Sequence, residues 1–206
     1  MTKNKTKGEK NMSKLSEAKV YGGIGAILML LGGAIIPGLG AIIGLIFLFI
    51  AVKYISEETK NESIFDNYLM HFICVIIALV AVAVIFFASI GGFTFFKALE
   101  SVNFSDPSAV WEFFQPYILW WVIGGIIGWV FFVISAMYLR KCYNSIADKT
   151  NVNMFKTTGT VYFIGAITLI IFIGIIIIVV AKILEIVAFF SIPEKLPEAA
   201  KPIESK

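Results

Sequence analysis

Long apolar runs, separated by short polar connectors, make up most of the chain. The first run covers residues 20–55 and contains a single charge, Lys53. One helix of that length would be about 54 Å long, whereas the hydrocarbon core of a bilayer is about 30 Å thick. Pro37-Gly38-Leu39-Gly40 interrupts the run near its middle. The pattern therefore predicts a hairpin of two antiparallel helices, over residues 20–36 and 39–55.

Three further apolar runs predict three more spans, over residues 67–90, 116–138 and 161–181. Each holds roughly the 20 consecutive apolar residues that cross a bilayer as a helix. Residues 186–192 continue the last run as an amphipathic or interfacial segment. We therefore expect an all-α integral membrane bundle over residues 20–192, with about five transmembrane helices and a glycine-rich hairpin at its start.

Polar segments flank this membrane domain and connect its spans. Residues 1–19 are basic and residues 193–206 are charged and rich in proline, so both are expected to be disordered tails. Asp106 followed by Pro107 predicts the start of a short interfacial helix, PSAVWEFFQP. Aromatic residues there predict a belt at one membrane depth, or alternatively a platform for an aromatic or lipid ligand. They are Trp111, Phe113, Phe114, Tyr117, Trp120 and Trp121.

Composition excludes an ordinary soluble domain. Of the 206 residues, 59% are hydrophobic and 15% are charged, and the mean hydropathy is +0.89. Soluble domains carry roughly 25% charged residues. A chain this small has no water-soluble core large enough to hide several apolar runs of about 20 residues. The surplus apolar surface is therefore expected to face lipid in the cell membrane.

Glycines at helical spacing predict close helix packing. Gly22 with Ala26, Gly40 with Gly44, and Gly124 with Gly128 are pairs of small residues four positions apart. Such pairs let helix backbones approach closely where lipid supplies no hydrophobic drive. The predicted helix-packing positions are Gly22, Gly25, Gly40, Gly44, Gly124 and Gly128. Flexing of glycine-rich helices is the alternative interpretation.

The distribution of Lys and Arg predicts the orientation. With five spans and a cytoplasmic N-terminus, twelve basic residues lie inside and five outside, as the positive-inside rule requires. The inner set is Lys3, Lys5, Lys7, Lys10, Lys14, Lys19, Lys53, Lys60, Arg140, Lys141, Lys149 and Lys156, and the outer set is Lys97, Lys182, Lys195, Lys201 and Lys206. This arrangement places the C-terminal tail outside. The basic N-terminal tail is expected to touch lipid headgroups and not nucleic acid, because it has no interleaved aromatic residues.

No catalytic constellation is visible, so we expect a protein that is not an enzyme and holds no cofactor or metal. The chain has no HExxH, GxSxG, P-loop or CxxC motif. Cys74 and Cys142 are expected to be buried or cytoplasm-facing thiols, and His71 an interfacial histidine that forms hydrogen bonds. Lys182 and Glu185 are spaced to pair at i,i+3 at the end of the last apolar run.

Several segments carry a resemblance to a known family. SEAKVYGGIGAILMLLGG, IAVKYISEETKNESIFDNYL and the sequence from Met154 to Pro193 resemble the prokaryotic membrane-protein family catalogued as domain of unknown function 996. The resemblance covers roughly residues 16–193. It implies a multipass fold, and it implies no activity, substrate or catalytic residue.

Three function classes follow from these observations. The interpretation we favour is a structural or assembly protein that packs or forms homo-oligomers through its glycine faces, with membrane lipids around it. The alternative is a small-solute channel or transporter, although the spans lack the internal ionisable groups that usually form such sites. An intramembrane enzyme is the least favoured class. No small-molecule ligand is indicated.

Overall fold

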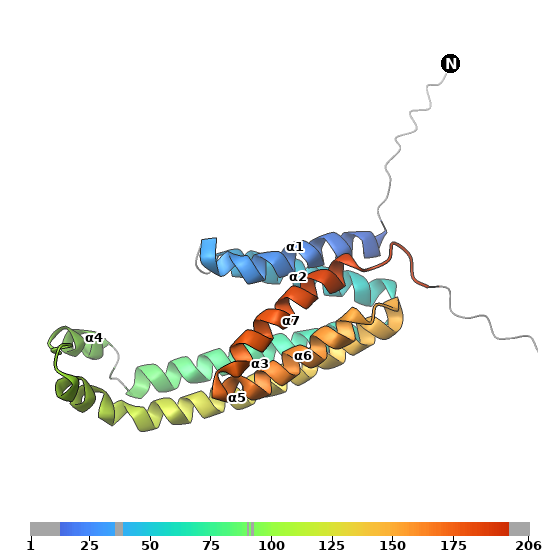
Figure 1. Ribbon diagram of the computed structural model, residues 1–206. Helices are drawn as coiled ribbons and strands as arrows, with labels where there is room; N and C mark the ends of the chain where they lie inside the picture. The colour runs from blue at the N-terminus through green and yellow to red at the C-terminus, as the bar shows by residue number, and fades with distance from the viewer. Residues whose placement is uncertain (1–12, 36–38, 90, 92, 198–206) are drawn as a thin grey trace, which may run out of the picture.

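The protein is a bundle of helices (Figure 1). The computed structural model describes residues 13–35, 39–89, 91 and 93–197, and no strand occurs among them. The helices are α1 (Lys14–Ile35), α2 (Leu39–Glu58), α3 (Glu62–Ser89), α4 (Phe93–Glu100), α5 (Pro107–Thr150), α6 (Met154–Thr168), the 3-10 helix η1 (Leu169–Ile171) and α7 (Ile173–Phe190). The predicted all-α bundle is confirmed. The expected tip at Pro37-Gly38 and the outer parts of both predicted tails lie outside the described residues.

Helices α1 and α2 form an antiparallel hairpin that depends on two facing glycines. A Cβ atom on Gly25 would lie 2.8 Å from the carbonyl oxygen of Gly44, and one on Gly44 would lie 2.7 Å from that of Gly25. Neither position has room for a side chain, so the two backbones are in direct contact. Near the open end of the hairpin, Tyr21 packs edge-on against Phe47 and Tyr54.

Helices α3 and α5 form a second, longer antiparallel hairpin, and α4 lies in the connection between them (Figure 1). Gly124 faces Ile85, and Gly128 packs against the side chain of Val82. Aromatic rings cluster where the two helices approach α4, and Phe86 stacks on Trp121 at 5.5 Å. The small residues bring the helices together, and the aromatic cluster fills the space where they meet α4.

Helix α5 differs from the prediction because it is continuous from Pro107 to Thr150. Asp106 caps it as expected, since its Oδ1 accepts a hydrogen bond from the backbone N–H of Ser108 at 2.9 Å. The expected interfacial helix and the expected span from residue 116 are therefore parts of one helix. Pro116 lies inside it, and the first turns bend toward α4 (Figure 1). A proline removes one backbone hydrogen bond, which explains a bend without a break.

The last predicted span, residues 161–181, is wrong as a single helix. The chain leaves α6 at Thr168, turns through η1 and reverses into α7. Phe172 adopts a left-handed conformation (φ 63°) at the turn. A Cβ atom on Gly174 would collide with the backbone of Gly165 and Leu169, so only glycine permits this close return. Helices α6 and α7 are therefore a third hairpin.

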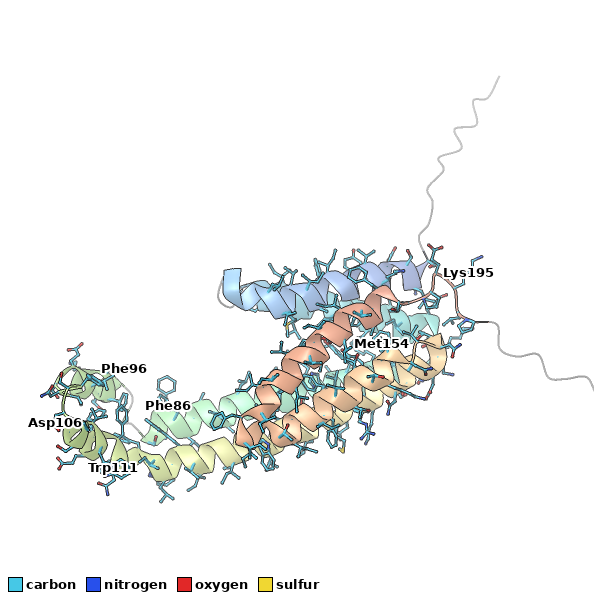
Figure 2. The ribbon with its side chains drawn as sticks, viewed as in Figure 1. Phe86, Phe96, Asp106, Trp111, Met154 and Lys195 are labelled. Atoms are coloured by element: carbon cyan, nitrogen blue, oxygen red, sulfur yellow. The ribbon has the colours of Figure 1, made fainter. Side chains whose placement is uncertain are left out.

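The third hairpin brings both described ends of the chain together. Ser13 Oγ donates a hydrogen bond to the carbonyl oxygen of Glu194 at 2.7 Å. Figure 2 shows Met154 and Lys195 at this end of the bundle, and Asp106 and Trp111 at the opposite end. The sequence pattern predicts the C-terminal tail on the opposite side of the membrane from the N-terminal tail. In the structure Ser13 and Glu194 lie together, because the chain reverses once more than that pattern indicates.

Four of the described helices are long and apolar enough to cross a membrane. They are Glu62–Ser89, Pro107–Thr150, Met154–Ile171 and Ile173–Phe190. Many large apolar side chains on them are exposed, for example Leu79, Leu119 and Ile176, which are 65–70% exposed. Water-soluble proteins rarely expose such continuous apolar surface. The fold is compatible with a multipass membrane protein.

The facing glycines of the first hairpin give a testable prediction. We expect Gly25→Ala to lower the unfolding free energy by about 1–3 kcal/mol, because its methyl group would press on the backbone of α2. The matched control is Gly125→Ala, since no atom lies within 4 Å of a Cβ atom at that position. Thermal unfolding of the purified variants measures both. Equal stability of the two variants would contradict close backbone contact at Gly25.

Candidate functional site

A cluster of polar side chains lies inside the bundle, where α7 crosses α5 and α6. We call it the polar cluster, and it comprises Lys182 and Glu185 from α7, Tyr143 and Ser135 from α5, Tyr162 from α6 and His71 from α3. Four helices therefore contribute to one site. This convergence makes it the candidate functional site of the described residues.

Lys182 and Glu185 form an ion pair at the centre of the cluster. Lys182 Nζ lies 2.8 Å from Glu185 Oε2, and the two residues are one helical turn apart. The phenol of Tyr143 donates a hydrogen bond to the other carboxylate oxygen, Oε1. Glu185 is 2% exposed, whereas the side chain of Lys182 is 17% exposed. The carboxylate is thus held at both oxygens, and the ammonium is the less enclosed partner.

Tyr162 links the ion pair to His71. Lys182 Nζ lies 5.3 Å from the centre of the Tyr162 ring, within the range of a cation–π contact. The ring of His71 packs edge-on against the same tyrosine at 6.2 Å. His71 Nδ1 lies 2.6 Å from Ser135 Oγ and 3.1 Å from the Ser135 carbonyl oxygen. The imidazole accepts from the hydroxyl or donates to the carbonyl, according to its tautomer. The contacts therefore run from α3 to α7, and the step between His71 and Tyr162 is ring packing and not a hydrogen bond.

Contacts on both sides of the polar cluster fix the position of α7. Phe189 packs edge-on against Phe155 at 5.1 Å, and Phe155 packs against Tyr143 at 5.4 Å. Gly22 of α1 leaves the space that the ring of Phe189 fills. On the other side, Trp129 Nε1 donates a hydrogen bond to the carbonyl oxygen of Ala166 at 3.0 Å. These contacts hold the α6–α7 hairpin against α1 and α5.

The polar cluster contains groups that can bind a proton or a small ion. It combines a carboxylate, an ammonium, an imidazole and phenols within one set of contacts. Removing two charges from water is costly unless they pair and find further hydrogen bonds, and Tyr143 supplies one. Ionisable groups inside an apolar bundle commonly mark proton or ion pathways. No group of three His, Cys, Asp or Glu side chains in the described part of the chain is arranged to hold a metal ion.

The predicted packing glycines lie apart from the polar cluster, at contacts between helices. Gly25 and Gly44 face each other, Gly22 faces Phe189, and Gly124 and Gly128 face α3. Gly40 lies in the first turn of α2. These five glycine contacts join helices of one chain. Gly125 differs from them, because it faces open space.

Sequence reasoning missed most of the polar cluster. The i,i+3 ion pair was expected, but at the end of an apolar run and not inside a helix that continues to Phe190. His71 forms hydrogen bonds as expected, but its partner is Ser135 in the interior. The sequence does contain a signal for a buried ion pair. The residues on both sides of Lys182 and Glu185 are apolar, so the two charges lie inside one apolar run. Cys74 and Cys142 are buried and free, which agrees with one of their two expected states.

The ion pair gives a stability prediction with a matched control. We expect Glu185→Gln to lower the unfolding free energy by about 3–5 kcal/mol, because it leaves the ammonium of Lys182 without its charged partner. The control is Glu57→Gln, which breaks the exposed ion pair between Lys14 and Glu57. Their hydrogen bond lowers the pKa of Glu57 and raises that of Lys14, but water screens the charges. Unfolding of the two purified variants measures the difference between their unfolding free energies. Equal losses in Glu185→Gln and Glu57→Gln would argue against a buried charge at Glu185.

A known protein is similar to this chain over most of its length. The uncharacterized protein MJ1644 of Methanocaldococcus jannaschii is 34% identical over 184 residues, which cover 89% of this chain and 96% of that protein. No solved structure matches the chain. The family described as "Protein of unknown function (DUF996)" matches residues 40–183, which confirms the resemblance seen in the sequence. The chain therefore belongs to the DUF996 family of proteins of unknown function.

Proposed function

We propose that the protein is a multipass protein of the cell membrane, with its charged end in the cytoplasm. The charged end is the end of the bundle where α1 begins and α7 finishes. Of the described basic residues, Lys14, Lys19, Lys53, Lys60, Arg140, Lys141, Lys149, Lys156 and Lys195 lie toward it. Lys97 lies at the other end, in α4, and Lys182 lies inside α7. This asymmetry supports a cytoplasmic charged end by the positive-inside rule.

Within that membrane protein, we propose that the polar cluster translocates a proton or a small ion. The observation that carries this proposal is the Lys182–Glu185 pair, which is enclosed between helices and linked through Tyr162 to His71. The main argument against a transporter was the lack of ionisable groups inside the apolar segments, and this pair removes it. The proposed step is binding and release, and it requires no bond-making reaction on a substrate.

Glu185 is more deeply buried than Lys182, and this difference suggests how protonation of Glu185 would affect the ion pair. Glu185 is anchored by Tyr143, whereas Lys182 is held by Glu185 and by the face of Tyr162. Protonation of Glu185 would remove the charge that retains the ammonium of Lys182. The lysine would then be free to pair with another anion or to leave the cluster. Proton binding is in this way coupled to a rearrangement at α7.

The structural role is the second candidate. Its support is that Gly22, Gly25, Gly44, Gly124 and Gly128 all bring helices into close contact. Because the atoms that face these glycines belong to the same chain, the contacts favour internal packing over homo-oligomerisation. A structural role accounts for the ion pair as a contact between helices but not for its link through Tyr162 to His71, and for this reason we place transport first.

The orientation is testable by labelling single cysteines. The background variant is Cys74→Ala/Cys142→Ala, and cysteines are then introduced at Ser13, Glu194 or Ser105. We expect an impermeant thiol reagent to label only the Ser105 variant in intact cells, because Ser105 lies between α4 and α5. Cell lysis should expose the other two positions. Labelling of the Ser13 and Glu194 variants from opposite sides would contradict the proposed topology.

Transport is testable in proteoliposomes that carry a pH-sensitive dye. We expect a membrane potential to drive proton or coupled ion flux through the wild type, and Glu185→Gln and Lys182→Met to abolish it. Lys14→Met/Glu57→Gln should keep the flux, since it removes an ion pair of the same chemistry at the exposed charged end. Gel filtration before reconstitution checks that every variant is folded. Flux equal to that of protein-free liposomes, or unchanged in folded Glu185→Gln, would refute the proposal.

A further inference from the structure

The α6–α7 hairpin reaches only part of the way along the α3–α5 hairpin (Figure 1). Its turn, residues 169–172, is entirely apolar, and Phe172 at its tip is 77% exposed. On α5, Trp129 lies at about the same depth in the bundle as this turn, because its Nε1 donates a hydrogen bond to the carbonyl oxygen of Ala166 near the end of α6. From there α5 extends a further 22 residues toward its start at Pro107. The turn therefore ends beside the middle of α5. Backbone groups at that depth must be hydrogen-bonded within the protein, and the N–H groups of Phe172 and Ile175 donate to the carbonyl oxygens of Leu169 and Phe172.

A groove of about 720 Å³ opens beside this turn. It lies between α3, α5 and the turn, and every residue that lines it is apolar or aromatic, including Trp129 and Phe172. Gly125 forms part of the wall and has no atom within 4 Å of where a Cβ atom would stand. Pockets of about 300–1,000 Å³ are the usual size for small-molecule ligands. The groove is thus large enough to be a binding site, and it offers a ligand no charge.

We propose that this groove binds a hydrocarbon chain of a membrane lipid from the leaflet farther from the charged end. The inference rests on the membrane location proposed above, and it is independent of transport. Along α5 the lining runs from Val122 to Phe132. Ten residues of helix measure about 15 Å, which is half of a hydrocarbon core of about 30 Å. The groove is therefore about as long as one leaflet is thick, and the turn between α6 and α7 forms one of its walls near the level of Trp129.

Aromatic residues fix the depth of the groove. Tyr117 and Trp121 stack at 6.1 Å just before the groove begins, and Phe95 packs edge-on against Tyr117 at 5.5 Å. Such rings gather at the level of lipid headgroups. A lipid with its headgroup at this level would run its chain along α5 to the turn.

The size of the groove argues against a helix of a second copy. A helix is about 10 Å across with a pitch of about 5.4 Å, and the lining along α5 from Val122 to Phe132 corresponds to fewer than three turns. A stable helix–helix contact in a bilayer extends over several turns. A single flexible chain fits the volume better. The occupant we infer is therefore a lipid chain.

The test uses the fluorescence of Trp129, which lines the groove, and phospholipids with brominated chains, which quench tryptophan on contact. The reporter protein keeps Trp129 and carries Trp111→Phe, Trp120→Phe and Trp121→Phe. A second reporter keeps Trp120, which is 52% exposed and does not line the groove. We expect quenching of Trp129 to saturate at a lower fraction of brominated lipid than quenching of Trp120. Quenching of Trp120 also reports membrane insertion, whether or not the groove holds lipid.

Gly125→Leu should fill the groove and remove the preferential quenching of Trp129. The matched control, Ala83→Leu, adds bulk on an exposed face of α3 outside the groove and should leave the preference intact. Native mass spectrometry should show one fewer retained lipid for Gly125→Leu only. Equal quenching of both reporters would overturn the inference, as would an unchanged preference in Gly125→Leu. A loss of dimer mass in Gly125→Leu would also overturn it, because the occupant would then be a second copy.

Discussion

The ion pair between Lys182 and Glu185 is the constraint on which the arrangement of the helices depends. Both residues lie within one apolar helix, so α7 is stable only if that side of it faces polar partners. Tyr143 and Tyr162 provide those partners from α5 and α6. The rotation and depth of α7 are thereby fixed. Phe189 then meets the space beside Gly22, and α1 docks on α7. One buried pair thus couples the third hairpin to the first.

The position of the α6–α7 hairpin also determines how the two ends of the bundle differ. Because the chain reverses at residues 169–172, Ser13 and Glu194 lie in contact at one end. Nearly all described basic residues gather toward that end, whereas aromatic rings dominate the other. The early turn leaves the outer half of α3 and α5 without a third helix, where the apolar groove opens. The groove and the polar cluster are neighbours, because Phe132 lines the groove and packs against Tyr162 of the cluster at 6.0 Å.

The sequence predicts the helical class and the first hairpin well because their signals are local. A run too long for one span, broken by Pro37-Gly38, indicates a reversal without knowledge of its neighbours. The same length argument applies to residues 161–192, which exceed one span, but Gly174 is a weaker break signal than Pro-Gly. Its role depends on the backbone of Gly165, which only the folded hairpin brings near. The polar cluster was hidden for a similar reason: its residues come from four helices, and only the i,i+3 spacing of Lys182 and Glu185 is local.

The most direct test of this account is the charge state of Glu185 in the folded protein. Isotope-edited infrared spectroscopy of protein with labelled glutamate, compared with Glu185→Gln, isolates the signal of this one carboxyl group. If the pair organises α7 as described, the difference spectrum at neutral pH shows the loss of an ionised carboxylate band and of no protonated carboxylic acid band. Loss of a protonated carboxylic acid band would contradict the account, because Glu185 would then carry no charge to hold Lys182.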